Sequence, residues 1–577
     1  MACNLLTSFQ DVLGRARCLG RNCCVTRFPE ETMKTSKPFE VSRIALALLL
    51  FACNAPVQAA PTCMGSCSVG PPNVSVGSFN AGDGTLTISG GDVVAAGGLG
   101  AIGLGGFGPP FGTNTGTATV SGTGSRLDIG GVANSQLIVG GERGTGVLSI
   151  IDNATVTSNA FNNAPNFGDA RVYVGRGGVG TVNINTGGSL LVRDLGPFGA
   201  EDGIQLGVST ANGPGTGTIN VDGTGSLLTV KGNAAFINVG VANTSFAGTQ
   251  AGIGTLNVTN GAQVLIDGTT GFGLLPIGRG GNSTGSVLVS GAGSRIDVKG
   301  TTFAGIAVAS DLQTNSDGNS GIGILHVTQN AVVATTTVLP AQTATSLFVG
   351  YGLGSGLVIV DSGGTLNLDR PLRVSHNTAT HNTQTGILLV NDSGVVNAPT
   401  TYVGNGTNSA INGTVGGTGT LNSNVVVQMG GLLDPGLSPG TLTIGGNVSF
   451  AGGTLRIQIG GLNIGGLNTG EFDILNVLGQ VDFNSSVIEF DFINDFLPKQ
   501  NDVFNFVSAQ SIVNIDKSSF RYSGLADGFL FGVSANGNEL QFNARNDGVA
   551  VPEPGTLALL GLGLAGLVTL RRRRLVH

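Results

Sequence analysis

The chain has 577 residues, of which 99 are glycine, 11% are charged and none is tryptophan. Glycine lies far above its average of about 7%, but only 20 residues are proline and no G-x-y period occurs, which excludes collagen. Low charge and a positive mean hydropathy exclude a disordered chain, which requires high charge and low hydrophobicity.

The charge balance also excludes one class of partner. Residues 44–570 contain 16 Lys and Arg against 30 Asp and Glu, a net charge of −14. Such a body repels phosphate backbones, and no basic run lies outside the two termini. We therefore predict that the protein does not bind nucleic acid.

The N-terminal region has the order of an export signal. Lys34, Lys37 and Arg43 precede an apolar run over residues 44–52. Small residues then allow a cut after Ala59. A charged segment, an apolar core and a small-residue cleavage site are typical of a secretory signal.

We therefore predict a signal peptide at 33–59, recognised by the Sec translocon and signal peptidase. Met33 has the features of a natural start, so residues 1–32 are interpreted as a misannotated upstream extension. Cleavage before Cys53, as in a lipoprotein, is the alternative.

A Pro/Gly-rich lead-in follows at 60–83. Of the seven cysteines, only Cys63 and Cys67 lie after the predicted cut. They can form a disulfide in an oxidising compartment. Two lone cysteines are a poor metal site, because nothing nearby supplies further ligands.

The central region repeats a short pattern. A glycine followed by alternating apolar residues recurs eleven times, from GTLTI at Gly84 to GTLNS at Gly419. The matches between them begin at Gly116, Gly146, Gly180, Gly217, Gly254, Gly285, Gly323, Gly356 and Gly386. These 335 residues make ten steps of 33.5 residues on average. A period of this length indicates a solenoid or a propeller.

The order of elements is constant within each unit. In the fourth unit GTVNIN is followed by the turn TGG, the segment SLLVRD, a variable loop and IQLGV. Alternation with period 2 between Gly and Asn turns predicts three short strands per unit. Val182 and Ile184, like Leu127 and Ile129, should face an interior column, and Asn183 should face water.

We therefore predict a parallel β-helix at 84–420 with about eleven three-stranded coils, in which each backbone N–H and C=O bonds to the next coil. A β-propeller needs roughly 40–50 residues and four strands per blade, and a sandwich would not repeat so regularly. The recurring GTxxVxGxGSxLxV…VG pattern resembles the passenger repeats of autotransporters. That resemblance implies a right-handed helix, and residues 432–461 resemble the end region of such passengers.

The composition changes after residue 420. Twelve of the 27 Phe residues lie between Phe450 and Phe542. Larger side chains indicate a thicker core without repeats. We predict an all-β capping domain at 421–548 that covers the open edge of the last coil, because exposed edges promote aggregation.

The last segment, 549–577, has three parts: a helix-breaking motif, a 16-residue apolar stretch at 555–570 and a basic cluster. The motif consists of Val551, Pro552, Glu553 and Pro554, and the cluster consists of Arg571, Arg572, Arg573 and Arg574. A transmembrane helix needs roughly 17–25 residues, and the arginine stems can cover the small deficit. The arginines should hold their end in the cytoplasm.

This tail closely resembles the PEP-CTERM sorting signal of exported proteins from Gram-negative bacteria that make exopolysaccharide. The resemblance implies an exosortase-type transpeptidase as a partner, which cuts near Pro-Glu-Pro. A simple C-terminal membrane anchor is the alternative. We expect anchoring in the inner membrane through the C-terminal helix before processing, and then a place on the cell surface or in the extracellular matrix.

The histidines and acidic loops do not indicate a metal site. His326 should face solvent from its strand, and His376 and His381 lie in a polar segment that we interpret as a loop. A metal site would need a third ligand fixed on a strand. The loop 315–321 lacks the distal acidic ligand of a calcium site. We predict no metal and no cofactor.

No catalytic constellation is evident either. Polysaccharide lyases and hydrolases with this fold need carboxylates beside Arg or Lys on adjacent coils. Arg126 with Asp128 and Arg295 with Asp297 occupy similar strands, but five coils separate them. We interpret them as surface ion pairs and predict that the protein is not an enzyme.

The sequence thus favours an exported structural or adhesive protein of the cell surface or matrix, associated with exopolysaccharide or biofilm. A carbohydrate-active β-helix enzyme is the alternative. Ice binding is a weaker one, because we expect that T-x-T triplets, such as those at Thr85 and Thr441, do not occur in successive coils.

Overall fold

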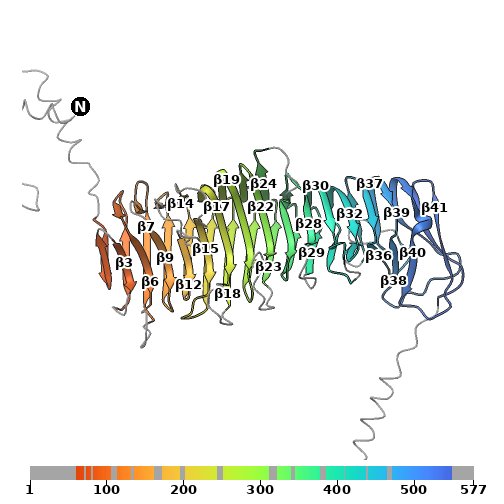
Figure 1. The fold of residues 1–577 in the computed structure, drawn as a ribbon, viewed down its shortest axis with the longest axis horizontal. Coiled ribbons are helices and arrows are strands. Elements are labelled where there is room, and N and C mark those ends of the chain that lie inside the picture. Colours follow the sequence, from red (N-terminus) through yellow and green to blue (C-terminus); the bar gives the residue numbers. More distant parts are fainter. Residues whose placement is uncertain are drawn as a thin grey trace, which may run out of the picture. The chain divides into compact units, whose positions relative to one another are not determined.

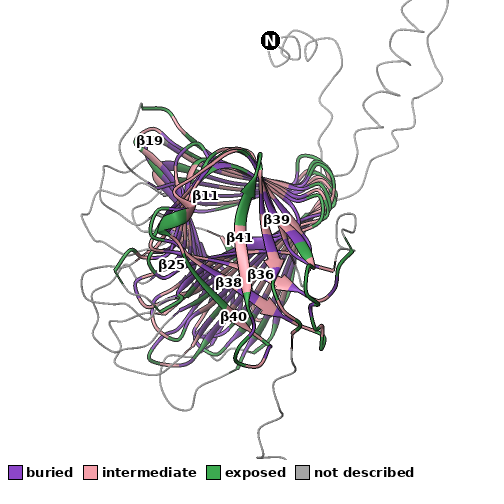
Figure 2. Cartoon of the chain, turned by 90° about the vertical axis from the view of Figure 1, so that its right-hand side faces the viewer, coloured by how far each residue is buried: buried purple, intermediate pink, exposed green. Residues whose placement is uncertain are grey.

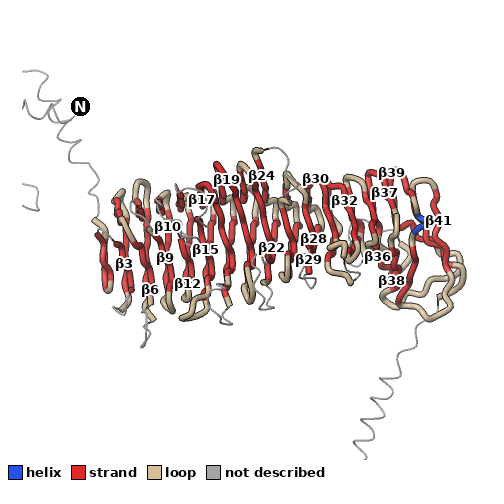
Figure 3. Tube along the Cα trace, in the orientation of Figure 1, coloured by secondary structure: helices blue, strands red, loops and turns tan. Residues whose placement is uncertain are grey.

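The computed structural model describes residues 60–70, 73–78, 82–105, 113–130, 135–160, 172–194, 202–242, 251–310, 321–339, 345–376, 385–407, 410–436, 439–463 and 471–548. All of them belong to the second of two compact units, which spans residues 58–577. They form an all-β solenoid of the right-handed type, whose coils follow one another along one axis (Figure 1). The helix among them is the short 3₁₀ turn η1 (Ile515–Lys517), near β41 (Phe531–Asn536) in Figure 3.

Each coil contributes strands to three faces, which we call faces A, B and C. Face A carries β1 (Thr62–Gly65), β4 (Gly84–Ile88), β7 (Thr115–Ser121), β10 (Thr145–Ile151), β13 (Val179–Asn185), β16 (Gly215–Asp222), β18 (Gly252–Thr259), β20 (Thr284–Ser290), β23 (Ile322–Thr328), β26 (Ser355–Val360), β29 (Thr385–Val390), β31 (Gly413–Gly417), β33 (Gly431–Pro435), β36 (Thr454–Ile459), β38 (Val487–Phe492) and β40 (Ser519–Ser523).

Face B carries β5 (Val93–Ala96), β8 (Arg126–Gly130), β11 (Thr155–Ala160), β14 (Ser189–Asp194), β21 (Arg295–Gly300), β24 (Val332–Thr337), β27 (Thr365–Asn367) and β34 (Thr441–Ile444). Face C carries β3 (Asn73–Ser78), β6 (Leu99–Leu104), β9 (Gln136–Gly141), β12 (Val172–Arg176), β15 (Asp202–Val208), β22 (Phe303–Ser310), β25 (Leu347–Tyr351), β28 (Leu372–His376) and β35 (Val448–Ala451). Six long strands bend from face B into face C: β17 (Leu227–Val241), β19 (Gln263–Arg279), β30 (Val395–Val403), β32 (Thr420–Gln428), β37 (Ile474–Asp482) and β39 (Val503–Val513).

The coils stack in register, as the repeats predicted. On face A every neighbouring pair from β4 to β40 is parallel, and equivalent repeat positions are partners, such as Gly146 with Gly180 and Gly180 with Gly217. Each coil therefore supplies backbone donors and acceptors to the next one. The predicted parallel β-helix is confirmed by this pairing.

The core consists of columns of like residues. Val182, Ile184, Leu127 and Ile129 are fully buried, whereas Asn183 faces outward. Viewed from the C-terminal end, buried and partly exposed residues alternate along the strands (Figure 2). One hydrophobic cluster runs from Val74 in the first coil to residues of the last strands. The predicted inward and outward positions are correct.

A separate capping domain at 421–548 is not found among the described residues, so this part of our prediction is not confirmed. The ladders continue through β33, β36, β38 and β40 on face A. Phe450, Phe483 and Phe490 are buried in the same continuous cluster as the repeats. Larger interior side chains fill the last coils without ending them. Among the described strands after residue 421, the antiparallel pairings are those of the final hairpin: β41 pairs with β42 (Glu539–Ala544), and β42 pairs with β39.

The eleventh repeat was also assigned to the wrong face. The segment after Gly419 forms β32, which pairs with β30 on face B, and the strand that continues face A is β31. Only two residues join β31 to β32. The turn between the two faces is therefore short here. A sequence pattern based on glycine and alternation cannot distinguish face A from face B.

Glycine is required where face C turns into face A. Gly140 has φ +69°, and a Cβ there would collide with the backbone of Val179 and Gly180 in the next coil. Gly180, at the start of its face A motif, lies equally close to the backbone of Val139. Two columns of glycine thus let the backbones of adjacent coils touch. Ala309 (φ 57°) and Ser375 (φ 65°) occupy two of these positions, so the rule has exceptions.

We predict that Gly140→Ala lowers the free energy of unfolding by about 3 kcal/mol, because it combines a left-handed backbone with overpacking. Gly223 is the matched control: it has φ +85° but no atom within 4 Å of an added Cβ. Gly223→Ala should therefore cost only about 1 kcal/mol. Urea unfolding of both variants tests the idea, and equal losses would contradict it.

Candidate functional site

The predicted sorting residues lie outside the described part of the chain. This applies to the motif at 551–554, to the apolar stretch at 555–570 and to the arginine cluster at 571–574. The predicted signal peptide at 33–59 lies outside it as well. Within the described ranges, no helix is both long enough and apolar enough to cross a membrane.

The two cysteines lie where the solenoid begins. Cys63 and Cys67 form a disulfide with their Cα atoms 5.5 Å apart. Cys63 belongs to β1, which pairs antiparallel with β4, and Cys67 begins β2 (Cys67–Gly70), which pairs antiparallel with β3. The bridge therefore holds together two short strands that cover the first edges of faces A and C. An uncovered edge would offer unpaired backbone groups to other chains.

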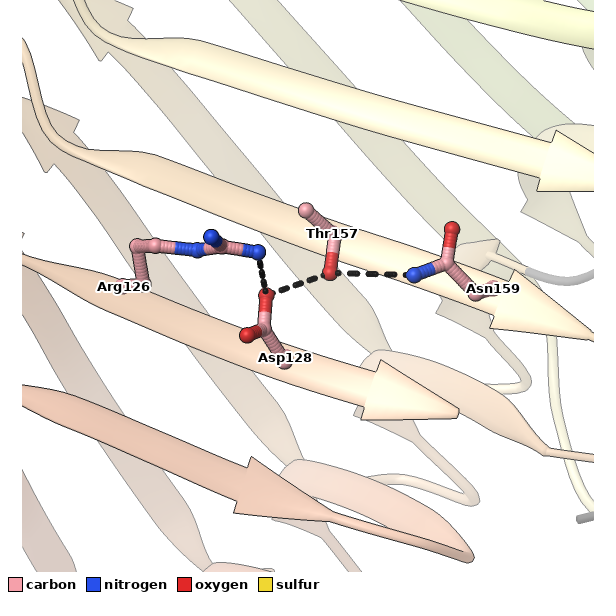
Figure 4. A network of polar contacts seen from close by, with 4 residues as sticks. All are labelled: Arg126, Asp128, Thr157 and Asn159. Carbon is pink, nitrogen blue, oxygen red and sulfur yellow. Dashed lines mark hydrogen bonds and ion pairs between the residues drawn. The ribbon is translucent and has the colours of Figure 1, made fainter. Parts of the chain in front are cut away.

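The two Arg–Asp pairs are local ion pairs on face B, as expected. An Arg126 Nη atom donates to Asp128 at 3.0 Å, and Arg295 Nε donates to Asp297 at 2.6 Å. Asp128 also accepts from Thr157 at 2.6 Å, so its oxygen is used by neighbouring side chains (Figure 4). The strands β8 and β21 are five steps apart in the face B order, so the pairs do not form one site.

Two described histidines have defined partners. His326 faces outward, as expected, and its Nε2 lies 3.0 Å from Asp361. The loop interpretation of His376 is wrong, because this residue ends β28 and its ring stacks on Tyr351 at 5.5 Å. Burial, and then the charge of Arg373, lower the pKa of His376. His381 lies outside the described residues.

The structure shows an acidic pair that the sequence did not reveal. Asp473, just before β37, is fully buried and accepts hydrogen bonds from the backbone N–H groups of Gly440 (2.9 Å) and Gln458 (2.8 Å). Burial raises its pKa to about 8, against the effect of these two bonds. Asp434 on β33 lies 3.5 Å from Arg456, and burial raises its pKa to about 6.

Raised carboxyl pKa values are common where acid–base chemistry occurs. Asp473 has no exposed surface, and both of its oxygens bond to backbone N–H groups, so it is not placed to meet a substrate. Through these two hydrogen bonds, Asp473 connects the segment before β34 with strand β36. Asp434 keeps part of its side chain exposed, beside a cation. Within the described residues, no group of three His, Cys, Asp or Glu could hold a metal ion.

The expectation that T-x-T triplets do not occur in successive coils is wrong. Thr85 and Thr87 pair with Thr117 and Thr119, so T-x-T triplets do occur in successive coils. The array is short, because Val147 follows Thr117 in the next coil. A pattern of two coils was missed because GTATV was matched only for its glycine and its apolar positions.

Comparison with known protein families gives one result. Residues 550–574 match the profile of the PEP-CTERM protein-sorting motif. The tail is a PEP-CTERM sorting motif. This motif implies an exported protein that an exosortase processes. No curated protein matches the chain.

We predict that Asp473 makes the protein less stable as the pH rises. Its folded pKa of about 8 exceeds the ordinary value of 3.8, so its contribution is fully present below pH 3.8 and is lost as pH rises towards 8. The slope can reach about 1.4 kcal/mol per pH unit. Comparing urea unfolding of the wild type and Asp473→Asn between pH 4 and 8 isolates this effect.

Asp369 is a control, because its pKa is shifted in the opposite direction to that of Asp473. Burial opposes its ionisation, but hydrogen bonds from Thr335, Ser346 and Thr337 prevail and lower its pKa. Its contribution is present above pH 3.8 and is lost as pH falls further. Asp369→Asn should therefore lose stability at neutral pH without reproducing the pH trend of Asp473→Asn. The assignment fails if Asp473→Asn keeps the wild-type slope.

Proposed function

We propose that this protein is a structural and adhesive component of the cell surface or extracellular matrix, associated with exopolysaccharide or biofilm. The sorting motif at 550–574 carries the proposal, because it implies export and exosortase processing. The stacked coils support it, since they display long outward faces on a scaffold held by backbone bonds. The proposal assigns no reaction, cofactor or nucleic acid to the chain.

The route follows from the signals at the two ends. The Sec translocon exports the chain and signal peptidase cuts after Ala59. The apolar stretch at 555–570 then spans the inner membrane with the arginine cluster in the cytoplasm. An exosortase-type transpeptidase cuts near residues 551–554 and releases the protein to the surface or matrix.

We predict that the mature protein lacks Arg571–Arg574. Mass spectrometry of the surface fraction should find a C-terminus near the Pro-Glu-Pro motif. The double substitution Pro552→Ala and Pro554→Ala should leave the intact chain in the membrane fraction, because the recognition motif is lost. The arginine cluster on the wild-type surface protein would contradict sorting by cleavage.

Deletion of the gene should reduce flocculation or biofilm mass.

The enzymatic alternative has one observation in its favour, the raised pKa of the partly exposed Asp434 beside Arg456. A carboxyl group that is protonated near pH 6 can act as a general acid. We predict that incubation of the exported protein with the native exopolysaccharide leaves its chain length unchanged. Shortening that disappears in Asp434→Asn would replace the structural proposal with a catalytic one.

A further inference from the structure

Three cations that are far apart in the sequence lie in one column on face B. Arg193 of β14 pairs with Lys231 of β17, Lys231 pairs with Asp267 of β19, and Asp267 pairs with Lys299 of β21. All three cationic residues are exposed. With a strand spacing of about 4.8 Å, the column from Arg193 to Lys299 is about 14 Å long.

This arrangement is unfavourable for the fold alone. Like charges at directly opposed strand positions are destabilising, and Arg193 faces Lys231 in this way. Asp267 forms an ion pair with Lys231 at 3.3 Å and offsets one cation. Within the described ranges, neither Arg193 nor Lys299 forms an ion pair. This column is therefore locally positive, although residues 44–570 have a net charge of −14.

Exposed aromatic rings lie just beyond the same column. Beyond Asp267, β19 bends into face C, and beyond Lys299 the chain continues into β22, where Phe272 of β19 pairs with Phe303 of β22. Phe272 is 38% exposed, and Phe303 is partly exposed. Cations and flat apolar rings thus meet at the corner between faces B and C.

We propose that this corner binds an acidic polysaccharide chain that runs along the solenoid axis. Its carboxylates would bond to Arg193, Lys231 and Lys299, and the apolar faces of its sugar rings would pack on Phe272 and Phe303. The inference rests on the proposed function and names the site and the sugar class for it. Carboxylates on an extended polymer match cations repeated along an axis, because both are spaced by a regular backbone.

The same charges do not favour nucleic acid. Tight binding to DNA uses about 6–10 phosphate contacts, whereas this column offers three cations, one of them already paired. The acidic body would also repel the rest of a long, densely charged duplex. A sugar polymer with one carboxylate per residue has a lower charge density.

The test uses the exported protein and alginate, a linear polymer of uronic acids. The triple substitution Arg193→Gln, Lys231→Gln and Lys299→Gln should weaken binding at least ten-fold. Carboxyl-reduced alginate, which has the same backbone without charge, should bind the wild type at least ten-fold more weakly. Raising the salt concentration should weaken the wild-type complex and affect the triple variant less.

The matched control removes three exposed cations elsewhere, through Lys499→Gln, Lys517→Gln and Arg521→Gln. It makes the same change in net charge and should bind alginate within two-fold of the wild type. Phe272→Ala should weaken binding several-fold, whereas Phe520→Ala, at a ring that is 36% exposed near the C-terminal end, should not. Thermal unfolding of each variant verifies that the fold is intact.

Three outcomes would overturn the proposal: equal binding by the triple variant and its control, equal binding of native and carboxyl-reduced alginate, or tighter binding of duplex DNA than of alginate. Fractionation of the producing cells separates this failure from that of the proposed function. A wild type that reaches the matrix without binding alginate removes only the sugar site. A wild type that is not exported removes the proposed function, whatever alginate binding shows.

Discussion

The structure depends on the in-register hydrogen bonding of one coil to the next. Within the described ranges, parallel pairing on face A is unbroken from β4 to β40. Adjacent backbones approach closely at the corner between faces C and A. The glycine columns that include Gly140 and Gly180 permit this approach, because a Cβ at either position would meet the backbone of another coil. The high glycine content is therefore a consequence of stacking.

Register also decides what the outward faces display. A residue's neighbours along the axis are its counterparts in the coils before and after, about one repeat away in sequence. Asn183, Asn220 and Asn257 form a ladder with amide hydrogen bonds of 2.9 Å for this reason. The same rule assembles Arg193, Lys231 and Lys299 into a basic column on an acidic chain.

The repeats predict most of the fold, because alternation and glycine spacing directly encode strand faces and corners. Val182 and Leu127 were correctly assigned to the interior. The face on which the segment after Gly419 lies was not predictable, because a shortened coil places a similar motif on face B. The region after Phe450 was not predictable for a related reason: larger residues fill the solenoid core there while the parallel pairing of face A continues.

The candidate sites also differ in how far the sequence predicts them. The sorting motif was predictable because its residues are contiguous in the sequence. Asp473 and the basic column were not predictable, because burial and neighbouring charge arise only when residues 15 to 38 positions apart in the sequence come together. In a stacked protein, side chains that lie next to each other on the surface come from different repeats. Columns of like charge are therefore found by aligning the sequence in coil register.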